Sequence, residues 1–150
     1  MWRPAEPRDD DDLIALSVAL NAEDPGPAPV PAEHVRRTLA TLRAAPSRGT
    51  ALVLEVDGRP AGYAFLIGFL SNELGGDVCV IDELYVAPAH RGHGHATRLL
   101  DDLATGAAPY AAGAVALALE TTPGNAAARR LYERVGFRAR NLAMRRLLPR

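Results

Sequence analysis

The stretch Arg91-Gly92-His93-Gly94-His95-Ala96 follows an apolar run that ends at Val86 and precedes an amphipathic helical pattern. A glycine-rich turn from a strand into a helix presents unpaired backbone N–H groups at the positive end of the helix dipole, where phosphate oxygens bind well. Gly92 and Gly94 can adopt backbone angles closed to other residues, and Arg91 adds a cation with a planar fork of donors. We interpret this glycine-rich turn, residues 91–96, as a pyrophosphate-binding turn.

Other phosphate-binding loops fit this segment less well. A P-loop has Lys followed by Ser or Thr, which is missing here, and the third glycine of the dinucleotide-binding fingerprint is missing too. A lone Gly-x-Gly more often marks a tight strand-to-helix turn without a ligand, so the flanking residues decide.

The flanking residues resemble the GNAT superfamily of N-acetyltransferases. Its acyl-CoA motif, Arg/Gln-x-x-Gly-x-Gly/Ala, is matched by Arg91, Gly94 and Ala96, and Leu84-Tyr85-Val86-Ala87-Pro88 stands where the superfamily has a strand ending in Leu-x-Val-x-Pro. A second motif, Asn-x-x-Ala-x-x-Leu-Tyr-x-x-x-Gly-Phe, is matched by Asn125, Ala128, Leu131, Tyr132, Gly136 and Phe137. The resemblance covers residues 78–138 closely and the rest of the chain only by pattern.

This resemblance implies an α+β fold, with a mixed, mostly antiparallel central sheet of six to seven strands, a splayed central pair and about four flanking helices. It implies one acyl-CoA N-acyltransferase domain over residues 1–150, which moves the acetyl group of acetyl-CoA to a primary amine by direct attack. The alternatives are a non-catalytic acyl-CoA-binding or regulatory module on the same fold, which would need neither Glu83 nor Tyr132, and an interaction domain without a ligand.

The resemblance also implies which residues contact acetyl-CoA. Two strands that diverge after Val86 and near Ala118 would hold the pantetheine arm by main-chain bonds. Asn125 is either such a contact or a simple helix cap. The full set of implied contacts is Leu84, Tyr85, Val86, Arg91, Gly92, His93, Gly94, His95, Ala96, Thr97, Asn125 and Tyr132.

Acetyl transfer to an amine needs a base for the ammonium proton, a donor for the developing oxyanion and an acid for the departing thiolate. Glu83, acting directly or through water, is our first candidate for the base and Asp82 the second. A backbone N–H near Val86 suits the oxyanion. By resemblance Tyr132 is the acid, although it also falls on an apolar helical stripe and fits a core role.

Asp82 and Glu83 interrupt an otherwise apolar strand pattern. Burial of an unpaired carboxylate is costly and raises its pKa, so the pair needs a reason. Alternation predicts that the two point to opposite faces and that, unless a bulge intervenes, only one faces the cleft. Both could instead be structural. With Glu73 and Asp77 nearby in sequence, the pair leads us to expect a cationic or amine-rich acceptor.

Composition limits the other functions. The 150 residues carry a net charge of -1 and 48% apolar residues, which gives no reason to expect a nucleic-acid or membrane partner. No apolar stretch approaches the roughly 20 residues of a membrane span, and we expect a cytoplasmic protein. The partner should be a small-molecule or peptide amine, and a homodimer stays open.

Neither a disulfide nor a metal site is expected. Cys79 is the single cysteine and lies in an apolar run, so we interpret it as a buried core thiol rather than a nucleophile. His90, His93 and His95 lie in the turn without a carboxylate or cysteine at ligand spacing, and we expect no metal there.

The remaining pattern predicts the order of the elements. A proline-rich loop at 23–31 follows the first helix and is either a substrate lid, by resemblance, or a plain linker. An Asp57-Gly58 hairpin turn joins two antiparallel strands. The expected elements are an edge strand at 2–5, helices at 9–22 and 31–45, strands at 50–56, 60–70 and 78–86, a helix ending near 106, a strand at 114–119, a helix at 125–135 and a final strand at 142–148.

Overall fold

The computed structural model describes residues 1–149 and divides them into two compact units. The first unit is Met1–Leu119, and the second begins at Glu120. No helix among the described residues is long and apolar enough to cross a membrane.

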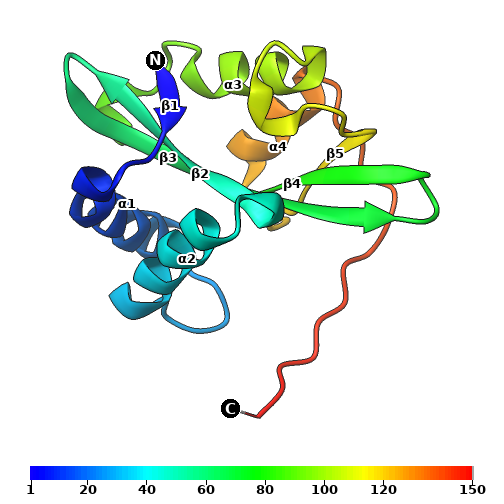
Figure 1. The fold of residues 1–150 in the computed structure, drawn as a ribbon, viewed down its shortest axis with the longest axis horizontal. Coiled ribbons are helices and arrows are strands. Elements are labelled where there is room, and N and C mark those ends of the chain that lie inside the picture. Colours follow the sequence, from blue (N-terminus) through cyan, green and yellow to red (C-terminus); the bar gives the residue numbers. More distant parts are fainter. Residues whose placement is uncertain (150) are drawn as a thin grey trace. The chain divides into compact units, whose positions relative to one another are not determined.

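The first unit is built on a five-stranded sheet in the spatial order β1-β2-β3-β4-β5 (Figure 1). The first four strands pair antiparallel, and β5 pairs parallel with β4. The expected edge strand and the Asp57-Gly58 hairpin are confirmed, and both turn residues have positive φ (50° and 74°), as a two-residue hairpin turn requires. The strands are β1 (Trp2–Pro4), β2 (Gly49–Val56), β3 (Arg59–Ser71), β4 (Gly76–Val86) and β5 (Ala116–Leu119).

Helices cover both faces of this sheet. The helices α1 (Asp10–Glu23) and α2 (Ala32–Ala44) pack on one face, and α3 (His95–Thr105) packs on the other (Figure 1). Apolar residues at helical spacing fix this packing. The core under α1 and α2 contains Leu13, Val35, Leu39, Leu42, Val53, Tyr63, Phe65 and Tyr85, and α3 buries Leu99, Leu100 and Leu103.

A β-bulge interrupts β4 at Asp82. Phe65 of β3 lies opposite Glu83, but the next residue, Leu66, lies opposite Ile81, so Asp82 is the extra residue. Neighbouring residues of a strand face opposite sides of the sheet, and Phe65 faces α1 and α2. The bulge therefore places Glu83 on the α1–α2 face and Ile81 on the α3 face.

The divergence of β4 from β5 begins earlier than we predicted. The ladder between them runs from Val78 and Ala116 to Ile81 and Leu119 and ends there, whereas β4 continues to Val86. The bulge follows directly after Ile81 and bends the strand at this point. The expectation of a divergence after Val86 is therefore wrong by five residues.

The second unit contains one helix, α4 (Ala126–Arg134), within its described residues. Asn125 caps this helix, because its side-chain oxygen accepts a hydrogen bond from the Ala128 N–H at 3.1 Å. Gly136 follows the helix with φ of 101°, as expected for the residue that ends it.

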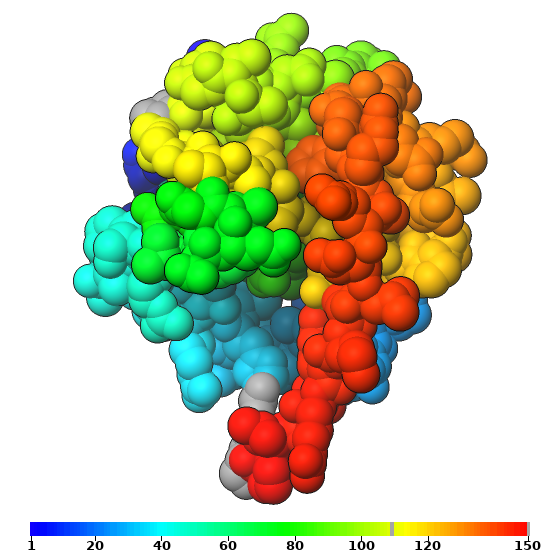
Figure 2. Space-filling model, turned by 90° about the vertical axis from the view of Figure 1, so that its right-hand side faces the viewer, coloured from blue at the N-terminus to red at the C-terminus, as the bar shows by residue number. Residues whose placement is uncertain are grey.

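The predicted strand at 142–148 is wrong. These residues join no ladder, and the large apolar side chains in them are 71–94% exposed. Figure 2 shows this C-terminal segment in orange-red to red. Arg145 and Arg146 break the apolar alternation, and an isolated extended segment does not pair its own backbone groups. The sheet accordingly has five strands in the described residues, not six or seven.

Candidate active site

The glycine-rich turn, residues 91–96, connects the end of β4 to α3. Gly92 and Gly94 have φ of 79° and 76°, angles that favour glycine, and a β-carbon added at either would meet no atom within 4 Å. The turn is thus open to approach from solvent. The first helical hydrogen bond at this end runs from the Arg98 N–H to the Gly94 carbonyl at 2.9 Å. The N–H groups of residues 95–97 have no acceptor inside the helix, and they suit phosphate oxygens.

The side chain of Trp2 supports the start of α3. Its indole N–H donates to the His95 carbonyl at 2.9 Å and ties the edge strand β1 to the first turn of the helix. Sequence reasoning missed this contact, because 93 positions separate the two residues and no local pattern links them.

The guanidinium of Arg91 faces back toward the sheet. Its Nε donates to the Val86 carbonyl at 2.8 Å, a terminal nitrogen donates to Glu23 at 2.7 Å, and its carbon lies 5.3 Å from the centre of the Tyr85 ring. These contacts anchor the turn to β4 and α1. The expected phosphate contact of this side chain stays a prediction.

Glu23, the last residue of α1, joins two groups near the turn. One of its carboxylate oxygens accepts from the Tyr85 hydroxyl at 2.7 Å, and the other accepts from Arg91. These hydrogen bonds, that from Tyr85 first, lower the pKa of Glu23. From the sequence we predicted that a loop begins at Glu23, and no pattern indicated either of its hydrogen-bond partners.

Glu83 lies half-buried on the α1–α2 face, where the Tyr63 hydroxyl donates to its Oε2 at 2.6 Å. Burial raises the pKa of Glu83, and the nearby Asp82 raises it further, while the hydrogen bond from Tyr63 lowers it. The same burial raises the pKa of Tyr63, so its hydroxyl stays a donor. A carboxylate with increased proton affinity suits a general base.

Asp82 and Glu83 differ in their surroundings. Asp82, the extra residue of the bulge, is exposed, whereas Glu83 packs between β3 and the helices. We expected the two side chains to point to opposite faces of the sheet unless a bulge intervened, and a bulge is present. The structure therefore separates an exposed carboxylate from a half-buried one.

Leu84, Tyr85 and Val86 lie beyond the point where β5 ends. This part of β4 pairs with β3 on one side, and the β5 ladder no longer reaches it on the other. Such a stretch offers main-chain donors and acceptors to a ligand, as the expectation for the pantetheine arm requires.

Two of the expected site residues belong to the second unit. The Tyr132 hydroxyl makes no hydrogen bond with any described residue, its ring meets Phe137 edge-on at 5.9 Å, and burial raises its pKa. Asn125 caps α4, which confirms its interpretation as a helix cap. Its contact with acetyl-CoA stays a prediction.

The histidines of the turn make local contacts. His93 Nδ1 lies 3.2 Å from the His90 carbonyl, and the rings of His93 and His95 are 6.0 Å apart. Burial lowers the pKa of His95. Within residues 1–149, no three His, Cys, Asp or Glu side chains are arranged to hold a metal ion.

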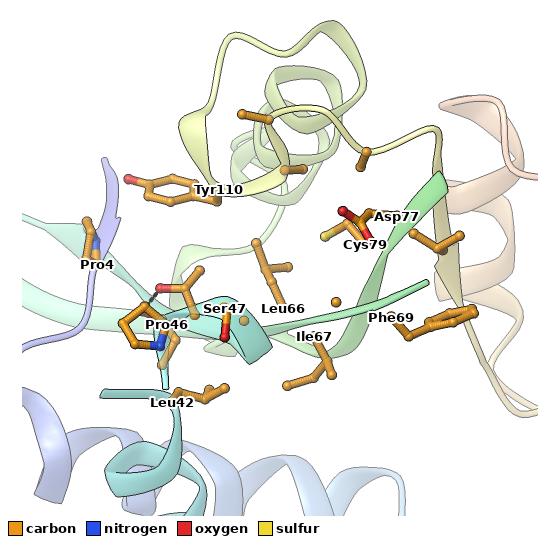
Figure 3. A pocket seen from close by; sticks show the side chains of 18 of the residues that line it. Pro4, Leu42, Pro46, Ser47, Leu66, Ile67, Phe69, Asp77, Cys79 and Tyr110 are labelled. Carbon is orange, nitrogen blue, oxygen red and sulfur yellow. Dashed lines mark hydrogen bonds between the residues drawn. The ribbon is translucent and has the colours of Figure 1, made fainter. Parts of the chain in front are cut away.

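A cavity of about 640 Å³ opens at the other end of β4 (Figure 3). Leu66, Ile67 and Tyr110 line it, together with Asp77 and Cys79 near the start of β4. Cys79 is buried, as expected, and burial raises the pKa of its thiol. This cavity lies away from the glycine-rich turn, which follows the opposite end of the strand.

Comparison with known proteins adds relatives of stated activity. Over 90 residues, 60% of this chain, the sequence is 37% identical to the L-2,4-diaminobutyric acid acetyltransferase of Nocardia farcinica, and it spans 44% of that relative's length. Among solved structures, an integron cassette protein from the mobile metagenome of Cole Harbour Salt Marsh has a TM-score of 0.80 at 25% identity, with coverage of 99% of this chain and 91% of that one.

A second solved structure, of a predicted acetyltransferase with acetyl-CoA from Clostridium acetobutylicum, has the same fold. Its TM-score is 0.76 at 17% identity, and the match covers 98% of this chain and 95% of that one. The model of the acetyltransferase (GNAT) family matches residues 16–137, which include β4, the glycine-rich turn and α4. The chain, in which β4 carries a half-buried carboxylate and leads into the glycine-rich turn, therefore belongs to the GNAT acetyltransferase family.

Proposed function

We propose that this protein transfers the acetyl group of acetyl-CoA to a primary amine. The observation that carries the proposal is the position of Glu83: a half-buried carboxylate that lies directly after the divergence of β4 from β5 and on the strand that leads into the glycine-rich turn. A base, an open main chain and a phosphate-binding helix start follow one another within about fifteen residues.

Acetyl-CoA fits the residues of the first unit. The N–H groups at the start of α3 suit its pyrophosphate, and the unpaired side of residues 84–86 suits its pantetheine arm. We also propose that Asn125 and Tyr132 contact acetyl-CoA. When bound, acetyl-CoA supplies the activated thioester carbonyl that the amine attacks.

Glu83 and Tyr132 each carry out one proton transfer in the proposed reaction. Glu83 takes a proton from the acceptor ammonium, directly or through water, so that the nitrogen lone pair can form the new C–N bond. A backbone N–H near Val86 donates to the carbonyl oxygen as negative charge develops there. As the C–S bond breaks, the Tyr132 hydroxyl gives its proton to the sulfur and is restored from solvent.

We propose a cationic small-molecule amine as acceptor. Asp82 and Glu83 provide negative charge beside the proposed reaction centre, and the relative from Nocardia farcinica is named for an amino acid with a second amino group. Glu73 and Asp77 lie near the start of β4, and Asp77 is about 20 Å along the strand from Glu83. We therefore leave these two carboxylates out of the proposed acceptor site.

A thiol-release assay with acetyl-CoA and a panel of small amines, polyamines and amino-terminal peptides tests this proposal. Turnover should occur with cationic amines, and Glu83→Gln should reduce kcat about 10²- to 10⁴-fold. Asp82→Asn is the matched control on the neighbouring residue and should cost less. Acetyl-CoA binding without turnover on any amine would instead favour a non-catalytic acyl-CoA-binding module.

A further inference from the structure

Tyr63 is the one described side chain that donates a hydrogen bond to Glu83. Its hydroxyl lies 2.6 Å from Glu83 Oε2, within the range for a hydroxyl that donates to a carboxylate. The two residues are 20 positions apart and meet because the β3–β4 register puts Tyr63 and Phe65 opposite Tyr85 and Glu83. Glu83 Oε1 is not used by this bond.

The ring of Tyr63 is held in a fixed place. The side chain is fully buried, meets Phe65 edge-on at 5.2 Å and lies 6.3 Å from the Tyr85 ring. Core rings packed on several sides do not change rotamer without a cost. The hydroxyl is therefore a rigid donor, unlike a mobile surface group.

The surroundings of this pair contain few other titratable groups. On β4 they are Asp82, which raises the pKa of Glu83, and Tyr85, whose hydroxyl binds Glu23 of α1. From α1, Ser17 lies beside the Tyr63 hydroxyl and lowers its pKa, although its Oγ is buried without a hydrogen bond of good geometry to any described residue. No cation acts on Glu83 among the described residues, so the hydroxyl of Tyr63 is the main group that favours the ionised carboxylate.

We infer that Tyr63 is the positioning residue of the acetyl-transfer reaction: it fixes Glu83 through Oε2 and so leaves Oε1 as the oxygen that takes the proton of the amine. This inference rests on the proposed function, because it assumes that Glu83 is the base. Because the Tyr63 side chain is fully buried, its role in this inference is exerted through Glu83 and not through contact with a substrate.

Loss of the Tyr63 hydroxyl should shift the pKa of Glu83 in one direction. The hydrogen bond from Tyr63 favours the charged form of Glu83, so its removal raises the pKa of that carboxylate. A base with a higher pKa is deprotonated only at higher pH. The acidic limb of the kcat/KM profile should therefore move to higher pH in Tyr63→Phe, and kcat/KM on that limb should fall about tenfold.

The test compares pH profiles of kcat/KM for the wild type, Tyr63→Phe and Tyr110→Phe, with the best amine of the panel. Tyr110 is a partly buried tyrosine beside the cavity, outside the proposed site, and its variant should keep the wild-type profile. Melting temperature and acetyl-CoA affinity show whether each variant is folded. An unchanged acidic limb in folded Tyr63→Phe would overturn the inference.

A second variant covers the case in which Tyr63→Phe does not fold. 3-Fluorotyrosine incorporated at position 63 alone keeps the ring and makes the hydroxyl a stronger donor, so the acidic limb should move to lower pH. An unmoved limb would again overturn the inference. Glu83→Gln separates this result from the proposed function: if that variant keeps full activity, the base assignment itself fails, whereas a large loss with unmoved limbs in the tyrosine variants refutes only the role of Tyr63.

Discussion

The guanidinium of Arg91 donates to the carboxylate of Glu23 at 2.7 Å and so joins the glycine-rich turn to the last residue of α1. Both side chains are nearly half exposed, at 46% and 41%, and ion pairs of this kind contribute about 0–1 kcal/mol to folding. The importance of the pair is therefore positional. It holds the turn beside the start of the proline-rich segment that follows α1.

We predict that Glu23 and Arg91 act on acetyl-CoA binding as a pair. Glu23→Gln should weaken acetyl-CoA binding no more than about fivefold, because the exposed ion pair is worth at most about 1 kcal/mol. In an Arg91→Gln background the same change should have almost no effect. Calorimetry on the two single variants and the double variant measures this coupling. Strictly additive losses would show that the two side chains act independently.

Gly94 should be required for acetyl-CoA binding because of its backbone angle. Gly94→Val places a branched side chain at φ of 76° and over the open side of the turn, so affinity should fall severely. Gly75→Val is a matched control, since Gly75 has φ of 74° and equally open surroundings in the β3–β4 hairpin. Both changes should cost about 1–2 kcal/mol of stability. Equal acetyl-CoA affinity in the two variants would refute the pyrophosphate assignment.

Asp9 should stabilise the first unit in a pH-dependent way. The carboxylate is buried and accepts two hydrogen bonds from the Arg3 guanidinium, at 2.8 and 2.9 Å, which lower its pKa. A lowered pKa in the folded state gives stability that is complete above the unfolded value near 3.9 and is lost as the pH falls through the folded value.

Asp9→Asn should therefore lower the free energy of unfolding by about 3 kcal/mol at pH 7. The difference from the wild type should shrink only below about pH 4. Urea unfolding across this range provides the measurement. Asp11→Asn, from the same acidic run but 97% exposed, is the control and should change little. A constant difference from pH 7 to pH 3 would argue that packing, and not charge, explains the effect of Asp9→Asn.

Tyr132→Phe should lower kcat while the melting temperature and acetyl-CoA affinity stay unchanged. The hydroxyl has no hydrogen-bond partner among the described residues, so its loss leaves no buried group unsatisfied. We expect a loss near 10²-fold, the low end for a general acid, because a thiolate is a tolerable leaving group. Steady-state kinetics with thermal denaturation and calorimetry test this. If kcat is unaffected, solvent protonates the thiolate.

Local patterns were sufficient to predict most elements of the first unit. Val35, Leu39 and Leu42 recur at helical spacing and are buried in the predicted helix at 31–45, and Asp57-Gly58 identified the hairpin, because each pattern depends on neighbours in the chain. The same reasoning failed at 142–148. Apolar residues there favour a strand, but a strand forms only with a partner, which a single segment of sequence does not reveal.

The candidate site was predictable in its composition but not in its contacts. The resemblance led to Glu83 and the turn, whereas the partners of these groups lie far away in the sequence. Tyr63 is 20 positions from Glu83, and Glu23 is 68 positions from Arg91. Their meeting depends on strand register and helix packing, which no spacing rule encodes.

The bulge at Asp82 determines which face of the sheet each later residue of β4 occupies. Because side chains alternate, this single extra residue turns everything from Glu83 onward to the opposite face relative to Ile81. Deleting Asp82 would restore a regular strand and leave Ile81 opposite Leu66 and Glu83 opposite Phe65, so no side chain would change face. A residue added elsewhere in β4 would instead enlarge the bulge or turn the residues beyond it to the opposite face, so Asp82 is the position where the length of this strand can change without moving Glu83.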